Sequence, residues 1–469
     1  MKRVLTIGGG LAGLAGAVTL AEAGHAVTLY ERRTFLGGRA SSFVHPNGGK
    51  LVDNCQHVLL RCCTNLTDFY NKLEVSDGIA FQDKIPFLDE ANRLSLIRKS
   101  PLPAPFHLLP SFFRFRALAL KDKLAIGYAM LHMMWAVRNP SRTDSLSMMQ
   151  WMLSHSQTDR TIEAFWRPIL VSALNDELED ITASYGIKTV VKAFLVNRRG
   201  YEVGLPVVPL GDLYDPCAAF LETRNGMVEL NRGVSRITLN DDAIESVTLS
   251  DGETVTADAY LSAVPFDVLL KLLPDDAIDA DSYFSELRRL EVSPITAVHI
   301  WLDRQVTDLD YAAILGRTIQ WVFNQRIRET PSKSPDSGSH LGLVISASDE
   351  LMKLPQQQII DRAMDDLRSL FPAVHDATLL KAIVVKEGRA TFAPKPGCDA
   401  RRPGPVSPIH NLFVAGDWTQ TGWPATMEGA VRSGYQAAEA VLAFMGTPRA
   451  VVQPDMPAEG VMKWIAGVD

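Results

Sequence analysis

Three glycines near the amino terminus have the spacing of a phosphate-binding turn. Gly8, Gly10 and Gly13 form a G-x-G-x-x-G pattern, and the acidic residue Glu31 follows them. In this pattern the first glycine permits a tight turn, the second lets the backbone approach a pyrophosphate, and the third allows close helix–strand packing. The acidic side chain accepts hydrogen bonds from ribose hydroxyls. These residues predict a site for the ADP half of a dinucleotide.

The segments around the glycines have the patterns needed to position them. A short apolar run at 4–7 is typical of a buried parallel strand, an alanine-rich helical stretch reaches residue 23, and a second strand at 26–30 ends before Glu31. The helix amino terminus supplies N–H groups and a positive dipole to phosphates. The glycine spacing alone also fits a helix-packing turn. The order strand, glycine turn, helix, strand and acid favours a dinucleotide fold of the α/β class.

Two further elements favour FAD over NAD. Gly37, Gly38 and Arg39 form a second backbone-permissive, cationic step beside the same pyrophosphate. Near the other end, the apolar run 412–415 leads into Gly416 and Asp417, and a helix is expected over 428–443. The amino terminus of that helix can stabilise negative charge at a flavin pyrimidine, and Asp417 can bind ribityl hydroxyls.

Composition limits the classes of protein. The chain has 469 residues, 46% hydrophobic and 22% charged, with a net charge of -7, so we expect two packed domains and no nucleic-acid partner. Its five cysteines form neither a C-x-x-C motif nor a paired framework, which predicts a reducing, cytoplasmic location and no metal site. The sequence contains no uninterrupted apolar run of about 18 residues, so we expect no transmembrane helix.

The pieces that would bind the flavin are separated along the chain. We expect a Rossmann-type FAD-binding domain, a parallel sheet with helices, from residues 1–75, 205–265 and 400–445. The stretches 76–204 and 266–399 would build an interleaved, mixed α+β substrate domain. Residues 446–469 would form a carboxyl-terminal tail.

One segment differs in charge from the rest of this acidic protein. Residues 98–142 contain eight lysines and arginines but the single acid Asp122, together with several aromatic and aliphatic side chains. This combination predicts an element that lies on an anionic membrane and admits a lipid-dissolved substrate. The alternative is a substrate-domain helix with a buried apolar face and a solvated basic rim.

The motifs GGGLAGL, ERRTFLGGR and NLFVAGDW resemble those of the FAD-binding superfamily that contains amine oxidases and carotenoid desaturases. The resemblance runs nearly end to end. It implies that Val234 contacts adenine through its backbone and that the Met427 N–H binds the flavin pyrimidine carbonyl. The expected cofactor-binding residues are therefore Gly8, Gly10, Gly13, Glu31, Arg32, Gly38, Arg39, Val234, Gly416, Asp417 and Met427.

A narrower resemblance rests on LVDNCQHVLL at 51–60 and on FWRPIL with ALN at 165–175. These stretches are similar to the squalene-associated FAD-dependent desaturases, the hydroxysqualene dehydroxylases of hopanoid biosynthesis. The sequence departs from the family at two positions. Cys55 stands where the family usually has glycine, and since glycine often marks a positive φ angle, the backbone conformation there is in question. Arg61 stands where a small residue is usual. The resemblance implies reductive removal of an allylic hydroxyl, so that hydroxysqualene becomes squalene.

This reaction needs a proton donor near the alcohol. The candidates are Asp53 and His57, with Asn175 among the polar groups that would position the substrate. Asp53 could instead cap a turn or bind an arginine, and His57 could be a structural histidine beside the flavin.

Three alternative functions remain open. The protein could be a carotenoid-type desaturase that oxidises an apolar polyene, or an amine oxidase, although no aromatic pair surrounds Trp423. It could also be a flavin-containing lipid carrier without turnover. The sequence contains no second dinucleotide motif for a reductant of FAD, so a free reduced nicotinamide and a partner protein are both candidate electron donors.

Overall fold

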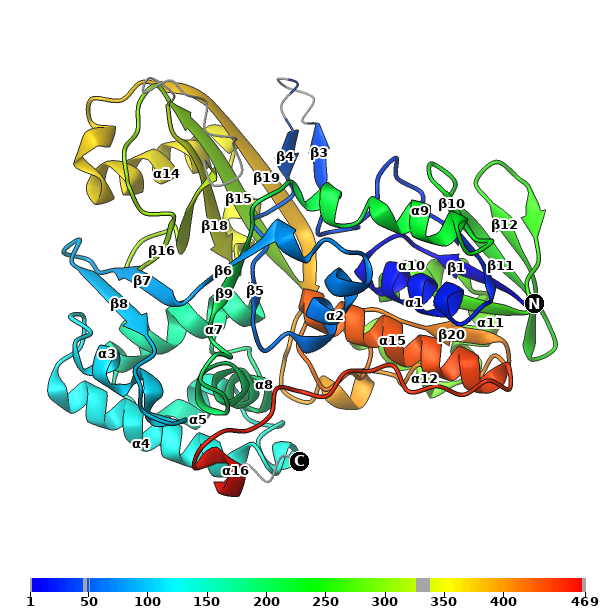
Figure 1. The fold of residues 1–469 in the computed structure, drawn as a ribbon, viewed down its shortest axis with the longest axis horizontal. Coiled ribbons are helices and arrows are strands. Elements are labelled where there is room, and N and C mark those ends of the chain that lie inside the picture. Colours follow the sequence, from blue (N-terminus) through cyan, green and yellow to red (C-terminus); the bar gives the residue numbers. More distant parts are fainter. Residues whose placement is uncertain (1, 45–48, 50, 326–337, 466–469) are drawn as a thin grey trace.

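The computed structural model describes residues 2–44, 49, 51–325 and 338–465. A five-stranded sheet with helices lies at one end of the molecule, and a larger sheet with a group of helices lies at the other (Figure 1). The chain passes between the two ends several times, so each is built from separated stretches of sequence.

The five-stranded sheet is entirely parallel and carries the dinucleotide motif. Its strands, in spatial order, are β10 (Met227–Glu229), β2 (Ala26–Tyr30), β1 (Arg3–Ile7), β14 (Ala259–Ser262) and β20 (Leu412–Val414). These strands come from three distant stretches of the chain. The expected α/β class with a parallel sheet is confirmed.

Helix α1 (Leu11–Glu22) explains the apolar start of the chain. Its residues are buried from Leu11 to Ala21 on all sides, because it packs against the sheet and against α15 (Met427–Phe444). Small residues allow this approach, since a Cβ atom placed on Gly434 of α15 would lie 2.2 Å from the backbone oxygen of Ala12. Close contact between the two helices brings the first and last flavin motifs together.

Smaller sheets and helices connect the two ends. An antiparallel sheet comprises β11 (Val234–Asn240), β12 (Ala243–Leu249) and β13 (Thr254–Val255), and a hairpin comprises β3 (Ser42–Val44) and β4 (Leu51–Asp53). A third sheet has the order β5 (Leu59–Leu60), β9 (Val203–Pro206) and β6 (Ile79–Gln82). Strand β9 therefore runs across the expected boundary between residues 204 and 205. The connecting helices are α2 (Thr64–Lys72), α9 (Pro216–Glu222), α10 (Phe266–Leu272), α11 (Asp275–Ala280), α12 (Ser282–Ser285) and α13 (Asp349–Met352).

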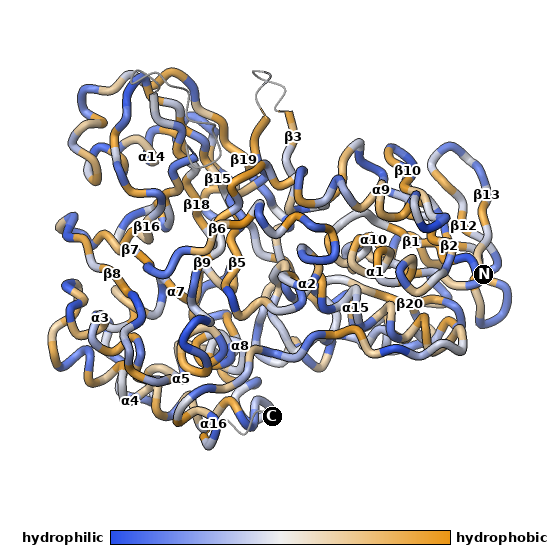
Figure 2. The backbone as a smooth tube through the Cα atoms, viewed as in Figure 1, coloured by the Kyte–Doolittle hydropathy of each residue, from blue (hydrophilic) through white to orange (hydrophobic). Residues whose placement is uncertain are grey.

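The larger sheet has seven strands and two apolar faces. Helix α14 (Gln356–Leu370) covers one face, where it packs on alternate residues such as Val298, Leu343 and Val384. The strands are largely hydrophobic along their length (Figure 2). Their spatial order is β19 (Leu379–Phe392), β15 (Val292–Leu302), β18 (His340–Ser346), β17 (Trp321–Asn324), β16 (Tyr311–Ile314), β7 (Lys84–Leu88) and β8 (Leu94–Arg98).

Helices gather beside the larger sheet. They are α3 (Leu109–Phe113), α4 (Leu120–Ala136), α5 (Met148–Ser154), α6 (Asp159–Thr161), α7 (Arg167–Leu174) and α8 (Ala183–Val190), with α16 (Met462–Ile465) from the carboxyl terminus. The tail runs from α15 to this group (Figure 1). The Glu459 N–H donates to Val196 at 2.9 Å, and Met462 is fully buried.

Helix α4 is apolar on two sides. Ile126, Ala129 and Met133 are buried, whereas Leu120 and Leu124 are each 61% exposed. The single acid of the segment, Asp122, is buried and accepts a hydrogen bond from the Ala119 N–H at 3.1 Å. The exposed side is therefore both apolar and basic. No helix in the described ranges is long and apolar enough to cross a membrane.

Candidate functional site

A cavity of about 510 Å³ extends from the carboxyl ends of the parallel strands to the larger sheet. Most of the expected cofactor residues lie on its wall, although they come from opposite ends of the chain. The structure places Gly13 and Asp53 outside this lining. The expected residues that line the cavity are Gly8, Gly10, Glu31, Arg32, Gly38, Arg39, Val234, Gly416, Asp417, Met427, His57 and Asn175.

The three glycines differ in what the fold demands of them. Gly8 has a φ of 104°, which side-chain-bearing residues rarely adopt. A Cβ atom on Gly13 would lie 2.0 Å from the Gly8 carbonyl oxygen, so Gly13 is required by helix–strand packing. A Cβ atom on Gly10 would meet nothing nearer than the Gly38 Cα at 4.0 Å. The space in front of Gly10 is therefore left open toward the cavity, as a pyrophosphate requires.

Glu31 is fixed at the cavity wall by backbone amides. Its carboxylate accepts hydrogen bonds from the Gly9 N–H at 2.7 Å and the Arg33 N–H at 2.8 Å. The second glycine turn rests on the first, since the Gly37 N–H donates to the Gly9 carbonyl at 2.9 Å. The two turns thus form one continuous cradle, with an acid at the position suited to a ribose.

Arg39 joins this cradle to the last cofactor motif. Its guanidinium donates to the Asp417 carboxylate at 2.6 Å and to the Ala390 carbonyl at 2.7 Å. Burial alone would lower the pKa of Arg39, but the charge of Asp417 outweighs burial and raises it. Arg39 therefore stays cationic in the cavity wall, where an anionic group would be stabilised.

The loop that follows Asp417 is organised by a buried arginine that the sequence did not single out. Arg402 donates to the backbone carbonyls of Asp417 at 3.1 Å and Trp423 at 2.9 Å, and also to that of Thr419. Burial lowers its pKa to about 9. In the sequence, the buried position of Arg402 is indicated by nothing more than its place in the proline-rich stretch 394–408, beside Arg401.

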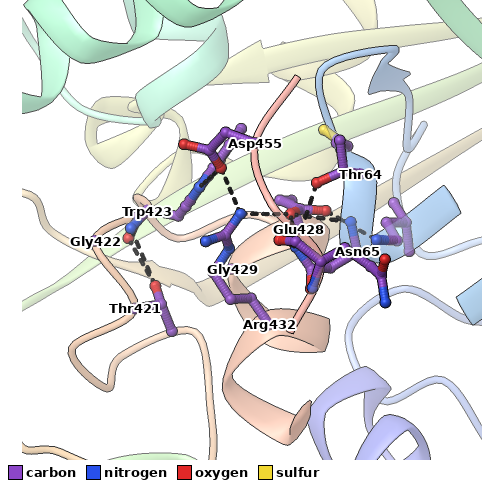
Figure 3. Close-up of polar contacts among 12 residues, drawn as sticks. Thr64, Asn65, Thr421, Gly422, Trp423, Glu428, Gly429, Arg432 and Asp455 are labelled. Carbon is purple, nitrogen blue, oxygen red and sulfur yellow. Dashed lines mark hydrogen bonds and ion pairs between the residues drawn. The ribbon is translucent and has the colours of Figure 1, made fainter. Parts of the chain in front are cut away.

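The amino terminus of α15 is held by a second set of buried polar contacts (Figure 3). Glu428 accepts hydrogen bonds from the Leu66 N–H and the Asn65 side-chain amide, both at 2.8 Å. The tail residue Asp455 accepts from Arg432 at 2.5 Å and from the Trp423 indole at 3.3 Å. Figure 3 shows these side chains converging beside the loop that leads into α15. The end of α15 that faces the cavity is thereby fixed.

Asp53 is not among the residues that line the cavity. Its side chain is buried, and it accepts hydrogen bonds from the Ser42 hydroxyl at 2.6 Å and the Leu210 N–H at 3.4 Å. Because Ser42 and Asp53 are paired across β3 and β4, both side chains point to the same side of the hairpin. These contacts favour a structural role for Asp53, whose described partners are a hydroxyl and a backbone amide rather than the arginine of the alternative expectation.

His57 and Asn175 do line the cavity, in different ways. The His57 Nδ1 lies 2.9 Å from the Cys55 carbonyl oxygen. Asn175 ends α7 in a left-handed conformation, and its amide donates to Thr391 Oγ1 at 2.8 Å while its carbonyl oxygen accepts from the Ala347 N–H at 2.9 Å. Asn175 thus joins three segments of the cavity wall.

Cys55, where the narrower resemblance led us to expect a glycine, shows no backbone strain. It is not among the described residues with positive φ. Burial raises the pKa of its thiol to about 12, so the thiol stays protonated. The backbone conformation at Cys55 therefore does not require glycine.

The far half of the cavity is apolar. Its wall is formed by the face of the larger sheet opposite α14 and by α7. Polar side chains enter this wall from the sheet at Ser346, Glu387 and Thr391, and from α7 at Ser172, whose hydroxyl accepts a hydrogen bond from the Trp321 indole at 2.6 Å. The apolar lining residues include Ile85, Phe87, Ile169, Ile295, Trp321, Phe323 and Val344.

A dinucleotide cradle that opens into an apolar cavity defines an FAD-dependent oxidoreductase. A family model described as flavin containing amine oxidoreductase matches residues 11–442. The chain belongs to this family, and FAD is its cofactor. When bound, FAD supplies hydride transfer to or from a carbon atom.

Curated relatives and solved structures agree on the fold. The zeta-carotene desaturase of Synechocystis sp. is 28% identical and the alignment covers 94% of this chain and 97% of the relative. The 15-cis-phytoene desaturase of Synechococcus elongatus is also 28% identical over 94% of this chain and 96% of the relative. An oxidoreductase from Methanosarcina mazei matches with a TM-score of 0.70 at 18% identity, over 92% of this chain and 98% of the other. Cyclohexylamine oxidase from Brevibacterium oxydans matches with a TM-score of 0.68 at 16% identity, over 95% of this chain and 99% of the oxidase.

Proposed function

We propose that the protein transfers hydride between FAD and a long, acyclic isoprenoid bound in the apolar half of the cavity. The observation that carries this proposal is the continuity of the apolar wall with the flavin cradle. A lipophilic chain would bury its surface against this wall, and only the carbon atoms near the cradle would reach the flavin. The names of the curated relatives, which act on carotenoids, support the same substrate class.

Two directions of electron flow are candidates. The relatives are desaturases, which supports oxidation of a polyene by the flavin. The second candidate is the reductive dehydroxylation of hydroxysqualene to squalene. A specific observation favours it: polar side chains interrupt the apolar wall at the end nearest the flavin cradle, where a hydrocarbon would leave them unsatisfied.

In either direction, we assign the same tasks to the chain. The turns at Gly8–Gly13 and Gly37–Arg39 would bind the pyrophosphate, and Glu31 would bind the adenosine ribose. Asp417, held by Arg39, would orient the ribityl chain. Trp423 and the end of α15 would flank the flavin and exclude water. His57 is a cavity-lining group that could move a proton.

The direction is tested by anaerobic mixing with two substrates while flavin absorbance and products are followed, the products by mass spectrometry. Reoxidation of photoreduced protein by hydroxysqualene, with squalene formed, supports dehydroxylation. Bleaching of oxidised protein by phytoene, with a further double bond formed, supports desaturation. If neither isoprenoid changes the flavin absorbance or gives a product, that result contradicts the proposed substrate class and favours a carrier role.

We also propose that α3 and α4 dock the protein on an anionic membrane. The exposed side of these helices combines apolar side chains such as Leu120, Leu124 and Trp135 with lysines and arginines, and its acid is buried. Such a surface buries its apolar residues in the headgroup region while its cations attract anionic lipid. Docking there would deliver a lipid-dissolved substrate to the cavity.

A further inference from the structure

Among the residues of the larger sheet that line the cavity, polar side chains gather at one end. Because residues paired across antiparallel strands share a face, Ser346, Ile295 and Glu387 form one row across β18, β15 and β19. All three line the cavity. Thr391, which pairs with Ser293 further along β19, lines it as well. The adjoining row contains Val344, Ala297 and Val385, which are all apolar. The polar side chains of the sheet that line the cavity are thus concentrated in a single place, whereas His299 and His340 lie toward the other end of this face, outside the cavity lining.

This polar end lies beside the flavin cradle. Arg39 donates to the Ala390 carbonyl, one residue before Thr391. The Asn54 side-chain amide donates to the Arg39 carbonyl at 3.0 Å and to Glu387 Oε2 at 3.3 Å. A ligand atom at the polar end would therefore lie at the part of the cavity closest to the cofactor-binding residues.

The polar side chains retain hydrogen-bonding capacity. Within the described ranges, Glu387 forms no ion pair, and its two hydrogen bonds, from Asn54 and from the Arg389 N–H, are long at 3.3 and 3.4 Å. The Ser346 hydroxyl, although buried, makes no hydrogen bond with a described residue. The Thr391 hydroxyl accepts from Asn175 and keeps its own hydrogen to donate.

We propose that Glu387, Ser346 and Thr391 form a subsite that binds a hydroxyl group carried by the isoprenoid. An ionised carboxylate only accepts hydrogen bonds, so Glu387 selects a ligand that has an O–H to donate. Ser346 and Thr391 can donate to the same oxygen. A hydrocarbon offers neither interaction, and a quinone carbonyl would face Glu387 without a hydrogen between them. This inference rests on the proposal that the cavity binds an isoprenoid, and it specifies an isoprenoid alcohol.

The test is equilibrium binding to the oxidised holoenzyme, in which no hydride is available for the alcohol. Hydroxysqualene and squalene have the same carbon skeleton, and each is titrated from detergent while the flavin absorbance spectrum is followed. We expect the alcohol to bind about 10-fold or more tightly, which is the effect of one hydrogen bond to a charged group. Glu387→Leu and Ser346→Ala should each reduce this ratio, and Glu387→Gln, which keeps an acceptor oxygen but removes the charge, should reduce it less than Glu387→Leu does.

Two controls separate the subsite from general effects. Val344→Ala should weaken both ligands by similar factors, because it removes only apolar contact. Glu245→Gln removes an exposed carboxylate elsewhere and should change neither. Flavin content and thermal melting of each variant establish that it is folded, and Ser346→Ala tests the subsite if Glu387→Leu does not fold.

Equal binding of the two ligands by the wild type, or an alcohol preference that survives both Glu387→Leu and Ser346→Ala, would overturn the subsite. Failure of both ligands to bind would overturn it together with the isoprenoid proposal. The direction of electron flow is judged separately. If the alcohol binds selectively but does not reoxidise the reduced protein, the subsite stands and dehydroxylation fails.

Discussion

The Arg39 guanidinium and the Asp417 carboxylate lie 2.6 Å apart, although 378 positions separate them in the chain. This pair links the second glycine turn to the loop that follows β20, so the expected pyrophosphate and ribityl regions of the site are fixed to each other. Asp417 is nearly buried, and Arg39 is only partly exposed. The pair is therefore a structural part of the cradle, which can be measured without flavin.

The first prediction concerns this pair. Arg39→Ala, Asp417→Ala and the double variant should give a coupling energy of about 1–2 kcal/mol in urea unfolding of the apoprotein, because each single change leaves a partner without its counter-charge. Additive effects of the two single changes would show that the pair contributes no interaction energy.

Two glycines that look alike in sequence should respond differently to alanine. Gly10→Ala places its Cβ in open space, so the protein should fold normally but lose flavin, measured as the ratio of absorbance at the flavin and protein maxima. Gly13→Ala would force Cβ against the Gly8 carbonyl and should lower thermal stability by several degrees or prevent folding. A flavin-replete Gly10→Ala protein would refute the assignment of that open space to the pyrophosphate.

Asp53→Asn should act on stability and leave the reaction nearly unchanged. The buried carboxylate accepts from Ser42 and Leu210, so its replacement should cost about 1–3 kcal/mol. Flavin content and the anaerobic rate of flavin reoxidation should stay within about threefold of wild type, because the side chain lies outside the cavity lining. A rate loss of a hundredfold with intact stability would restore Asp53 as the proton donor.

The pH dependence of stability should report on Asp176, next to the cavity residue Asn175. Burial raises the pKa of Asp176 to about 6, and its Oδ2 has no hydrogen-bond partner among the described residues. Because the folded-state pKa is raised, ionisation is disfavoured in the folded protein, and stability is lost as pH rises from about 4 to about 6. Asp176→Asn should therefore add about 1–2 kcal/mol at pH 7 and nothing at pH 4. Equal effects at both pH values would contradict this origin.

Membrane docking predicts charge-dependent flotation. Wild-type protein should float with anionic vesicles and not with neutral ones, and a variant with Arg114, Arg116, Lys121 and Lys123 changed to Gln should lose most of this binding. The matched control removes four exposed arginines elsewhere: Arg288, Arg289, Arg304 and Arg368. The absence of flotation by the wild-type protein, or equal loss in the control, would argue against this docking surface.

The sequence predicted those parts of the site that depend on local order. The glycine turns and Glu31 are fixed by the strands and helix directly beside them, so their spacing was sufficient. Asp53 shows the limit, because alternation along a three-residue strand turned it toward Ser42, whereas Asn54 and His57, after the strand ends, reach the cavity.

Other residues depend on contacts that no local pattern contains. Arg402 acquires its place from carbonyls of a loop that only the folded chain brings around it. Glu387 faces the cavity because its partner across the sheet is Ile295, almost a hundred positions away. Strand pairing of this kind sets which side chains face inward, and a single sequence does not specify that pairing.

The interleaving of the chain also sets the order in which the protein can mature. The glycine turns of the cradle are synthesised long before β20, α15 and the tail residue Asp455, which complete it. Domains otherwise tend to fold from the amino terminus during synthesis. Here helix α1 stays uncovered until α15 packs on it, so flavin capture requires synthesis of the chain as far as α15 and Asp455.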